Sequence, residues 1–282
     1  YFAVGGYAAT FLNMGLVGLC CLGLYVLCGA TPNNVSTLAF VLTLGFCSWG
    51  INILNIWPTV LGVVLYCLVK KEKLGANVNA MLFSTGIAPL ISDLLVRHPY
   101  PDVVGFNLYG FVVAMIVGIA IGFFLPAGLT HSPKVHKGFD LYSAAVPVCL
   151  FAFFLNATLF KTMGIELPAA PGADTLLVAS RLTVNLFCCI LFGLCIVFAL
   201  AMGCKPKQYL ALLTAPEHVG SVSSQMGTEV FLMNVGVFGL FILAYYNLIG
   251  ASFNGVTMGI IFCMLCTCNS GSHPGNVWPI ML

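Results

Sequence analysis

The sequence has very little charge. Of its 282 residues, 10 are Lys or Arg and 8 are Asp or Glu, so charged residues make up 6%, against about 25% in an ordinary globular domain. Hydrophobic residues make up 60%, and the mean hydropathy is +1.05. A water-exposed surface cannot be built from so few charges. This composition excludes a disordered chain, a nucleic-acid-binding protein and a secreted disulfide scaffold. It predicts an all-α integral membrane protein, a polytopic helical bundle whose first partner is the lipid bilayer.

The sequence also lacks a starting Met and the basic stretch that opens a signal peptide. The chain begins at Tyr1 and ends at Leu282, inside an apolar run. We therefore expect it to be a fragment of a longer protein.

The 13 cysteines lie mostly within apolar stretches, where a thiol behaves as a small hydrophobic group. We expect them to be reduced packing residues. Cys263, Cys266 and Cys268 have a spacing like that of metal ligands, but no second cluster accompanies them, so we predict no metal and no cofactor.

Apolar stretches long enough to cross a bilayer core of about 30 Å need about 20 residues of helix. The candidate spans are residues 7–29, 35–69, 74–96, 103–125, 141–159, 176–204, 228–249 and 256–282. The second of these is too long for one span, since a helix over residues 35–69 would extend about 52 Å. Its middle, residues 50–58, contains Gly, two Asn and Pro, which predicts a broken helix or a re-entrant hairpin.

The few charges mark the ends of the spans. Lys and Arg collect on the cytoplasmic side of membrane proteins, so we expect the lysines around residues 70–73, 134–137 and 205–207 to share that side. Asp93 and Arg97 are four residues apart and are expected to form an ion pair on one helix.

The sequence contains an internal repeat. At an offset of 221, residues 13–61 align without a gap onto residues 234–282, with 18 identities in 49 positions. The matches include Asn, Tyr, Trp and Pro residues, which shared hydrophobicity alone would not place in register. We predict a first membrane repeat over residues 1–221 and the start of a truncated second repeat over residues 222–282. A single crossing by the broken segment would make the copies parallel, and two crossings would invert them. The glycines at 15, 18, 236 and 239 predict close helix contacts.

The two breaks are the predicted substrate pathway, because irregular backbone inside a membrane must be satisfied by protein or by a water-filled cavity. The pathway residues are Asn52, Asn55, Trp57 and Pro58 in the first copy and His273, Asn276, Trp278 and Pro279 in the second. The alternative is structural: the asparagines would satisfy backbone groups, and the tryptophans would anchor helix packing or the membrane interface.

Two charged residues within spans are candidates for coupling, Glu229 and Arg181. The predicted spans place them near opposite membrane faces, so a direct pair is not expected. A helix-start role for Glu229, where a carboxylate complements the helix dipole, is the alternative.

The pair of Asn-x-Trp-Pro motifs, at residues 55–58 and 276–279, and the segment His-Lys-Gly-Phe-Asp-Leu-Tyr at residues 136–142 resemble a family of bacterial polytopic membrane proteins of unknown function with a duplicated domain. The resemblance covers essentially the whole chain and implies a location in the bacterial plasma membrane. A looser resemblance is to urea transporters, whose half-repeats have an Asn-Asn turn, a short pore helix and then a span. Asn33-Asn34, the stretch to Trp49 and residues 75–79 follow that order.

These observations predict a multi-pass transporter or channel for a small polar solute, with no catalytic residues and a homo-oligomer left open. The alternative is an intramembrane enzyme or assembly factor that uses a cytoplasmic linker containing His131, His136 and Asp140.

Overall fold

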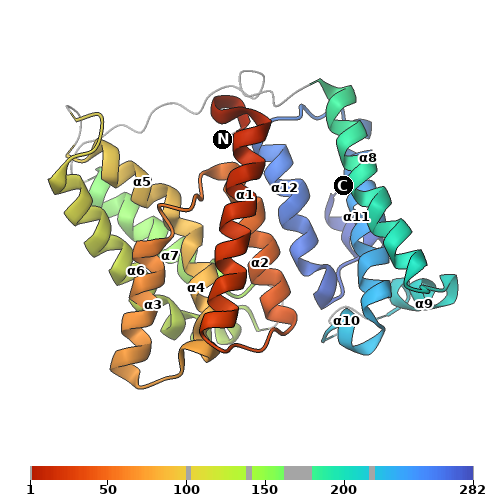
Figure 1. Cartoon of the computed structure of the whole chain (residues 1–282), viewed down its shortest axis with the longest axis horizontal. Coiled ribbons are helices and arrows are strands. Elements are labelled where there is room, and N and C mark those ends of the chain that lie inside the picture. The colour runs from red at the N-terminus through yellow and green to blue at the C-terminus, as the bar shows by residue number, and fades with distance from the viewer. Residues whose placement is uncertain (1, 100–102, 138–141, 162–179, 216–219, 282) are drawn as a thin grey trace. The chain divides into compact units, whose positions relative to one another are not determined.

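The computed structural model describes residues 2–99, 103–137, 142–161, 180–215 and 220–281. All regular elements in this part of the chain are helices, which Figure 1 labels along the chain. The main α-helices are α1 (Phe2–Leu27), α2 (Asn34–Phe46), α3 (Trp57–Lys70), α4 (Val78–Ser84), α5 (Ala88–Arg97), α6 (Leu108–His136), α7 (Ala145–Leu155), α8 (Arg181–Ala201), α9 (Pro206–Leu213), α10 (Val222–Gln225), α11 (Thr228–Leu248), α12 (Gly255–Met264) and α13 (Pro274–Met281).

Short 3₁₀ and π segments extend or connect these helices. They are η1 (Cys47–Trp49), η2 (Leu74–Asn77), η3 (Thr85–Ile87), the π-helical η4 (Asn156–Lys161) and η6 (Leu265–Ser270).

The helices confirm the expected all-helical, apolar fold. Five segments are long and apolar enough to cross a membrane: Gly5–Leu27, Leu74–Arg97, Leu108–His136, Arg181–Ala201 and Thr228–Leu248. Four further apolar helices are shorter: Asn34–Trp49, Trp57–Lys70, Ala145–Leu159 and Gly255–Ser270.

The predicted break in the second apolar stretch is confirmed. Helix α2 ends at Phe46, η1 follows, and regular helix resumes only at Trp57. At 13 residues, α2 is about 20 Å long, which is shorter than a bilayer core. The stretch that aligns with it in the sequence is also broken, between η6 and α13. Re-entry of either segment into the membrane stays a prediction.

Helix α6 corrects one expected boundary. The sequence pattern ended this span at residue 125, before Pro126, but the helix continues through Pro126 and Pro133 to His136. Proline removes only its own amide donor, and the surrounding turns of a long apolar helix hold their geometry. His131 and His136 therefore lie on the helix and not in a linker, whereas Asp140 lies outside the described residues.

The chain forms two compact units. Unit 1 comprises Tyr1–Thr10, Pro32–Ser48 and Gly172–Leu282, and unit 2 comprises Phe11–Thr31 and Trp49–Pro171. The first break thus begins where the chain passes from unit 1 to unit 2. The repeat boundary at residues 221 and 222 stays a prediction. The compact units show which segments pack together, and they do not show which segments arose by duplication.

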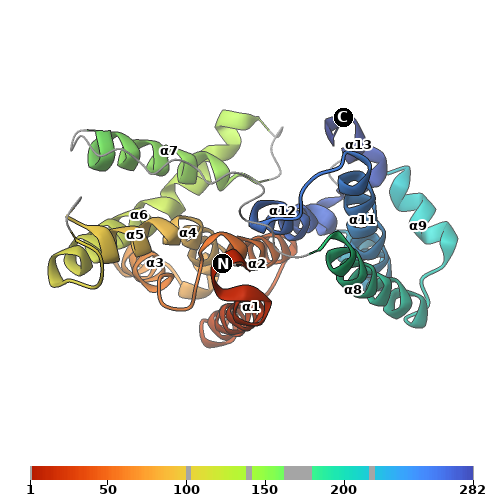
Figure 2. The ribbon, with the colours of Figure 1, turned by 90° about the horizontal axis from the view of Figure 1, so that it is seen from above.

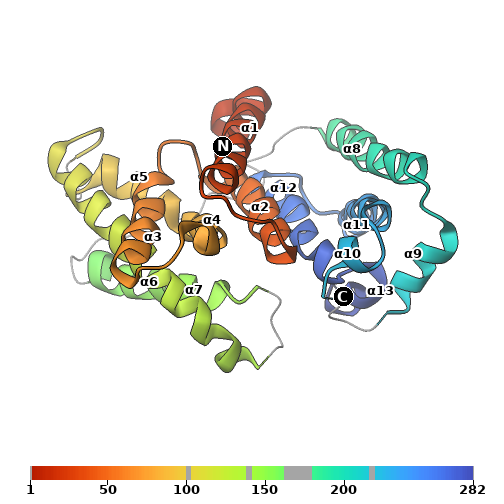
Figure 3. The same ribbon diagram turned by 60° about the horizontal axis from the view of Figure 1, so that its bottom comes forward.

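Unit 2 is centred on the close packing of α3 against α6 (Figure 3). Gly62 of α3 faces Gly122 of α6, and a Cβ on Gly122 would overlap the carbonyl oxygen of Thr59. Pro58 lies against Gly118, and the rings of Tyr66 and Phe123 are 5.9 Å apart, so the two helices run in the same direction. Their lysine-bearing ends therefore lie at the same end of unit 2.

Helix α5 carries the predicted ion pair. Arg97 Nη1 lies 3.3 Å from Asp93 Oδ1, one helical turn away. Both side chains are partly exposed, so the pair contributes little to stability.

In unit 1, α8 packs along α11 (Figure 2). A Cβ on Gly236 or Gly239 would collide with Phe192 of α8, which confirms the predicted close contact at these two glycines. At Gly15 the prediction was wrong, because a Cβ there would meet nothing within 4 Å. The amides of Asn185 and Asn247 exchange hydrogen bonds of 2.8 and 3.0 Å between the same two helices.

Unit 1 also brings together two helices whose sequences align in the predicted repeat. Helix α2 packs against α12 and η6. Gly45 lies against Cys263, whereas Thr37 Oγ1 accepts a 3.2 Å hydrogen bond from Asn269 Nδ2. Residues near the end of α2 therefore meet the last turn of α12, and residues near its start meet η6 farther along the chain. The two helices are antiparallel.

A substitution at Gly122 tests the packing of unit 2. We expect Gly122→Ala to lower the free energy of unfolding by about 1–3 kcal/mol, because the added methyl group forces α3 and α6 apart. The measurement is unfolding in mixed detergent and SDS micelles. The matched control is Gly193→Ala in α8, where a Cβ meets nothing within 4 Å. Equal stability of the two variants would contradict the close contact.

Candidate functional site

The first break, residues 50–56, is held in shape by two asparagine side chains. Gly50 has a φ of 118°, a conformation that glycine adopts without strain. Asn55 Oδ1 accepts a 2.9 Å bond from the backbone amide of Asn52, and Asn55 Nδ2 donates to the Gly50 carbonyl at 2.8 Å. Asn52 Oδ1 in turn accepts from the amides of Leu54 and Asn55. The hydrogen bonds of these two side chains thus replace the backbone hydrogen bonds that are lost where the helix is interrupted.

The second break, residues 271–273, has the same local geometry. Gly271 has a φ of 108°. Asn276 Oδ1 accepts from the amide of His273 at 2.9 Å, and Asn276 Nδ2 donates to the Gly271 carbonyl at 3.0 Å. His273 Nδ1 accepts from the amide of Gly275 at 3.1 Å, which is the bond that Asn52 makes to Leu54 in the first copy. The buried imidazole thus takes the place of an asparagine as a turn acceptor.

Each break is also bound by an asparagine from the helix that precedes α2 or α12. In unit 2, Asn13 Nδ2 donates to the Ile51 carbonyl at 2.8 Å. In unit 1, the fully buried Asn234 donates to the equivalent carbonyl, that of Ser272, at 2.8 Å, and to that of Cys268 at 3.3 Å. The predicted pathway omitted Asn13 and Asn234. The signal that could have found them is that Asn13 aligns with an identical residue, Asn234, in the sequence repeat.

The side-chain amide of Asn55 makes most of its possible hydrogen bonds to groups of the protein itself. It is buried, and its Nδ2 donates to Ser92 Oγ of α5 at 2.9 Å as well as to Gly50. This is the structural role that the sequence left open as the alternative. Asn276 is only half-buried and makes the same two local bonds. Contact of either amide with a solute stays a prediction.

The Trp-Pro pairs that follow the breaks are placed differently. Trp57 is 40% exposed and Trp278 is 49% exposed, so neither indole is enclosed within its own unit. Pro58 is buried against Gly118 of α6, whereas Pro279 is exposed. The structure brings Asn52 together with Asn55, and His273 together with Asn276. The two breaks belong to separate units.

The two candidate coupling residues lie at opposite ends of the α8–α11 pair. Arg181 begins α8, and its guanidinium donates to Asn247 Oδ1 at 3.2 Å and to the Ala251 carbonyl at 2.9 Å near the end of α11. Glu229 lies in the first turn of α11, where its carboxylate complements the positive end of the helix dipole. About 18 residues of helix, or about 27 Å, separate Glu229 from Asn247.

The histidines of the alternative enzyme do not form a common site in the described part of the chain. His131 is exposed, and His136 Nε2 is 2.8 Å from Ser143 Oγ. Five residues of α-helix turn the two side chains about 140° away from each other. No described contact favours a catalytic role for them.

The described helices thus form an apolar helical protein with five candidate membrane spans and two helix breaks whose backbone is hydrogen-bonded by asparagine side chains. The chain matches the model of the family described as Protein of unknown function (DUF1576) over residues 1–161 and 207–282, and it belongs to that family. This confirms the expected membership in a family of unknown function, whereas the bacterial source and the likeness to urea transporters stay predictions. No curated protein and no solved structure matches the chain.

Asn234→Ala tests whether the hydrogen bonds of Asn234 stabilise the second break. The substitution leaves the buried carbonyls of Ser272 and Cys268 without this donor, so we expect a loss of about 1–3 kcal/mol in the free energy of unfolding. Asn156→Ala, which removes an exposed amide in η4, is the control. An Asn234→Ala protein as stable as this control would show that the bond does not hold the break.

Proposed function

We propose that the chain carries one copy of a membrane repeat and the start of a second, inverted copy, and that it acts as a transporter or channel for a small polar solute, with the pathway at the two helix breaks. The observation that carries the proposal is the shared construction of the breaks, each in a helix too short to cross the membrane alone.

The proposed duplication is supported by equivalent positions that have equivalent conformations. Gly29 and Gly250 have φ values of 62° and 68°. Asn33 and Asn254 each cap the next helix through a capping box. Such polar detail is not required merely to bury apolar surface, so two unrelated segments would not be expected to share it.

The inversion is supported by the antiparallel packing of α2 against α12. A two-fold axis in the membrane plane exchanges the copies and makes equivalent helices run in opposite directions, whereas parallel copies keep their directions. The contacts run in opposite directions along two helices whose sequences align in the repeat.

The solute class follows from the groups available at the breaks. The polar side chains there are amides and one imidazole, and formal charges are nearly absent from the apolar segments. A neutral solute that exchanges hydrogen bonds with amides and backbone carbonyls fits such a pathway, whereas a polyanion would find no counter-charge.

Insertion of an epitope tests the inversion. We expect a tag between Pro32 and Asn33 and a tag between Ser252 and Phe253 to be reached from opposite sides of the membrane, because the starts of α2 and α12 lie at opposite ends of an antiparallel pair. The measurement is antibody labelling of sealed and permeabilised cells, with each insertion made in a separate protein. Labelling of both tags from the same side would contradict inverted copies.

Solute flux tests the function. In proteoliposomes, we expect stopped-flow light scattering to show selective entry of a small uncharged solute from among urea, formamide and glycerol. The double variant Asn55→Ser and Asn276→Ser should slow this entry at least about tenfold, because each serine is too short to hold both ends of its break.

The matched control is Asn107→Ser, which removes the amide donor to the His98 carbonyl and involves no residue of either break. Gel filtration and tryptophan emission establish that each variant is folded before flux is compared. Absence of entry for all three solutes in the unmodified protein, or an equal loss in the control, would contradict the proposed pathway.

A further inference from the structure

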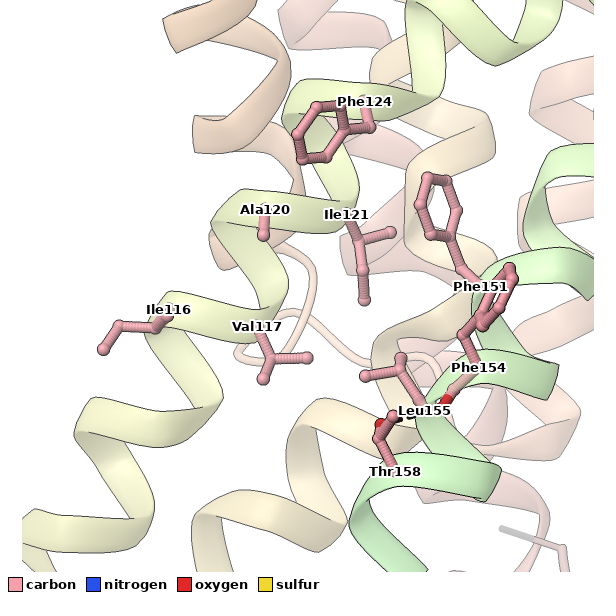
Figure 4. A pocket seen from close by; sticks show the side chains of 9 residues that line it. All are labelled: Ile116, Val117, Ala120, Ile121, Phe124, Phe151, Phe154, Leu155 and Thr158. Atoms are coloured by element: carbon pink, nitrogen blue, oxygen red, sulfur yellow. Dashed lines mark hydrogen bonds between the residues drawn. The ribbon is translucent and has the colours of Figure 1, made fainter.

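An apolar pocket lies between α6 and α7 in unit 2 (Figure 4). Its volume is about 220 Å³. Figure 4 shows one wall formed by α6 and the other by α7 and the start of η4, with aliphatic and aromatic side chains on both. The lining residues are Ile116, Val117, Ala120, Ile121, Phe124, Phe151, Phe154, Leu155 and Thr158.

The lining side chains of the pocket offer no spare hydrogen-bond donor to a ligand. Its one hydroxyl, that of Thr158, donates to the Phe154 carbonyl at 2.7 Å, as the dashed line in Figure 4 marks. Ile116, Phe124 and Phe154 at its rim are each more than half exposed. In a membrane, a pocket of this kind accommodates hydrocarbon and not a hydrogen-bonding solute.

A charged surface lies at one end of the same two helices. Helix α6 has 29 residues, about 43 Å, and is therefore about 13 Å longer than a bilayer core. The excess falls at its C-terminal end, where Thr130, His131 and Lys134 are exposed, followed by Lys137. Because α3 runs parallel to α6, the lysines around residues 70–73 mark the same end of unit 2.

The start of α7 adds to the positive potential of this end. Helices α6 and α7 are antiparallel, since Gly128 lies against Pro147 while Val117 and Thr158 share the pocket. The amino-terminal end of α7, which carries the positive end of its dipole, thus lies beside the last turns of α6. The 2.8 Å contact between His136 Nε2 and Ser143 Oγ joins these two segments.

The spacing of the two features matches one phospholipid. Ten residues of helix, about 15 Å, separate Phe124 at the near end of the pocket from Lys134. Half of a bilayer core is also about 15 Å. An acyl chain whose phosphate lies at the lysines would therefore place its terminal part in the pocket.

We propose that α6 and α7 bind one anionic phospholipid, with its phosphate at Lys134 and Lys137 and one acyl chain in the apolar pocket. The proposal is independent of the transport function. The two lysines provide selectivity for the anionic headgroup, and the pocket provides affinity for the chain that anionic and zwitterionic lipids share.

Native mass spectrometry of the full chain in detergent tests the site, with phosphatidylglycerol and phosphatidylcholine of identical acyl chains as the probes. We expect the unmodified protein to prefer phosphatidylglycerol. Lys134→Gln with Lys137→Gln should weaken phosphatidylglycerol binding about fivefold for each lysine and leave phosphatidylcholine binding unchanged. The control is Lys205→Gln with Lys207→Gln, the same change of charge in unit 1.

Ala120→Leu and Ala120→Phe test the pocket. These side chains extend into it in two steps, so binding of both lipids should fall progressively. Ala152→Phe, at an exposed alanine of α7 that does not line the pocket, is the matched control. A phosphatidylglycerol with a photoreactive group at the end of one acyl chain should label peptides that contain residues 116–124 or 151–158, which requires no variant.

Three outcomes would overturn the proposal. They are equal affinity of the unmodified protein for the two lipids, equal losses in the two lysine pairs, and photolabelling elsewhere. Dimerisation that Ala120→Phe abolishes while lipid binding persists would assign the pocket to a second copy of the chain instead.

Discussion

The structure depends on one constraint, the cost of leaving backbone amides and carbonyls unpaired in a chain that is almost wholly apolar. Helices meet this cost by themselves, but the two breaks cannot. At each break an asparagine within the turn binds the backbone on both sides, and a second asparagine on the preceding helix holds a carbonyl at the centre. The fold can therefore contain interrupted helices because these amides replace the missing helical bonds.

Glycine has a different role in the same bundle. Helices without a strong hydrophobic drive between them associate through close packing, and small residues permit the backbones to approach. Gly62, Gly118 and Gly122 allow this between α3 and α6, as Gly236 and Gly239 do between α11 and α8. These contacts fix the direction of each pair, so they determine which helix ends lie side by side.

Much of the fold could be predicted because hydropathy and proline report on local structure. The break after Trp49 and the ion pair of Asp93 with Arg97 follow from spacing alone. The extension of α6 through Pro126 and Pro133 was missed, because a proline signals a lost donor without showing whether the neighbouring turns hold. The role of Asn13 and Asn234 was also missed, since a single amide in a helix does not indicate which distant carbonyl it will bind.

The sequence by itself determined that the chain is apolar and helical, that its second and last apolar stretches are interrupted, and that residues 13–61 align with residues 234–282. These properties follow from composition and short-range order. The tertiary structure decided that α2 and α12 pack antiparallel, that α3 and α6 run together, and that a pocket opens beside α7. Helix direction and packing depend on contacts between residues far apart in the chain, and periodicity along one helix does not encode them.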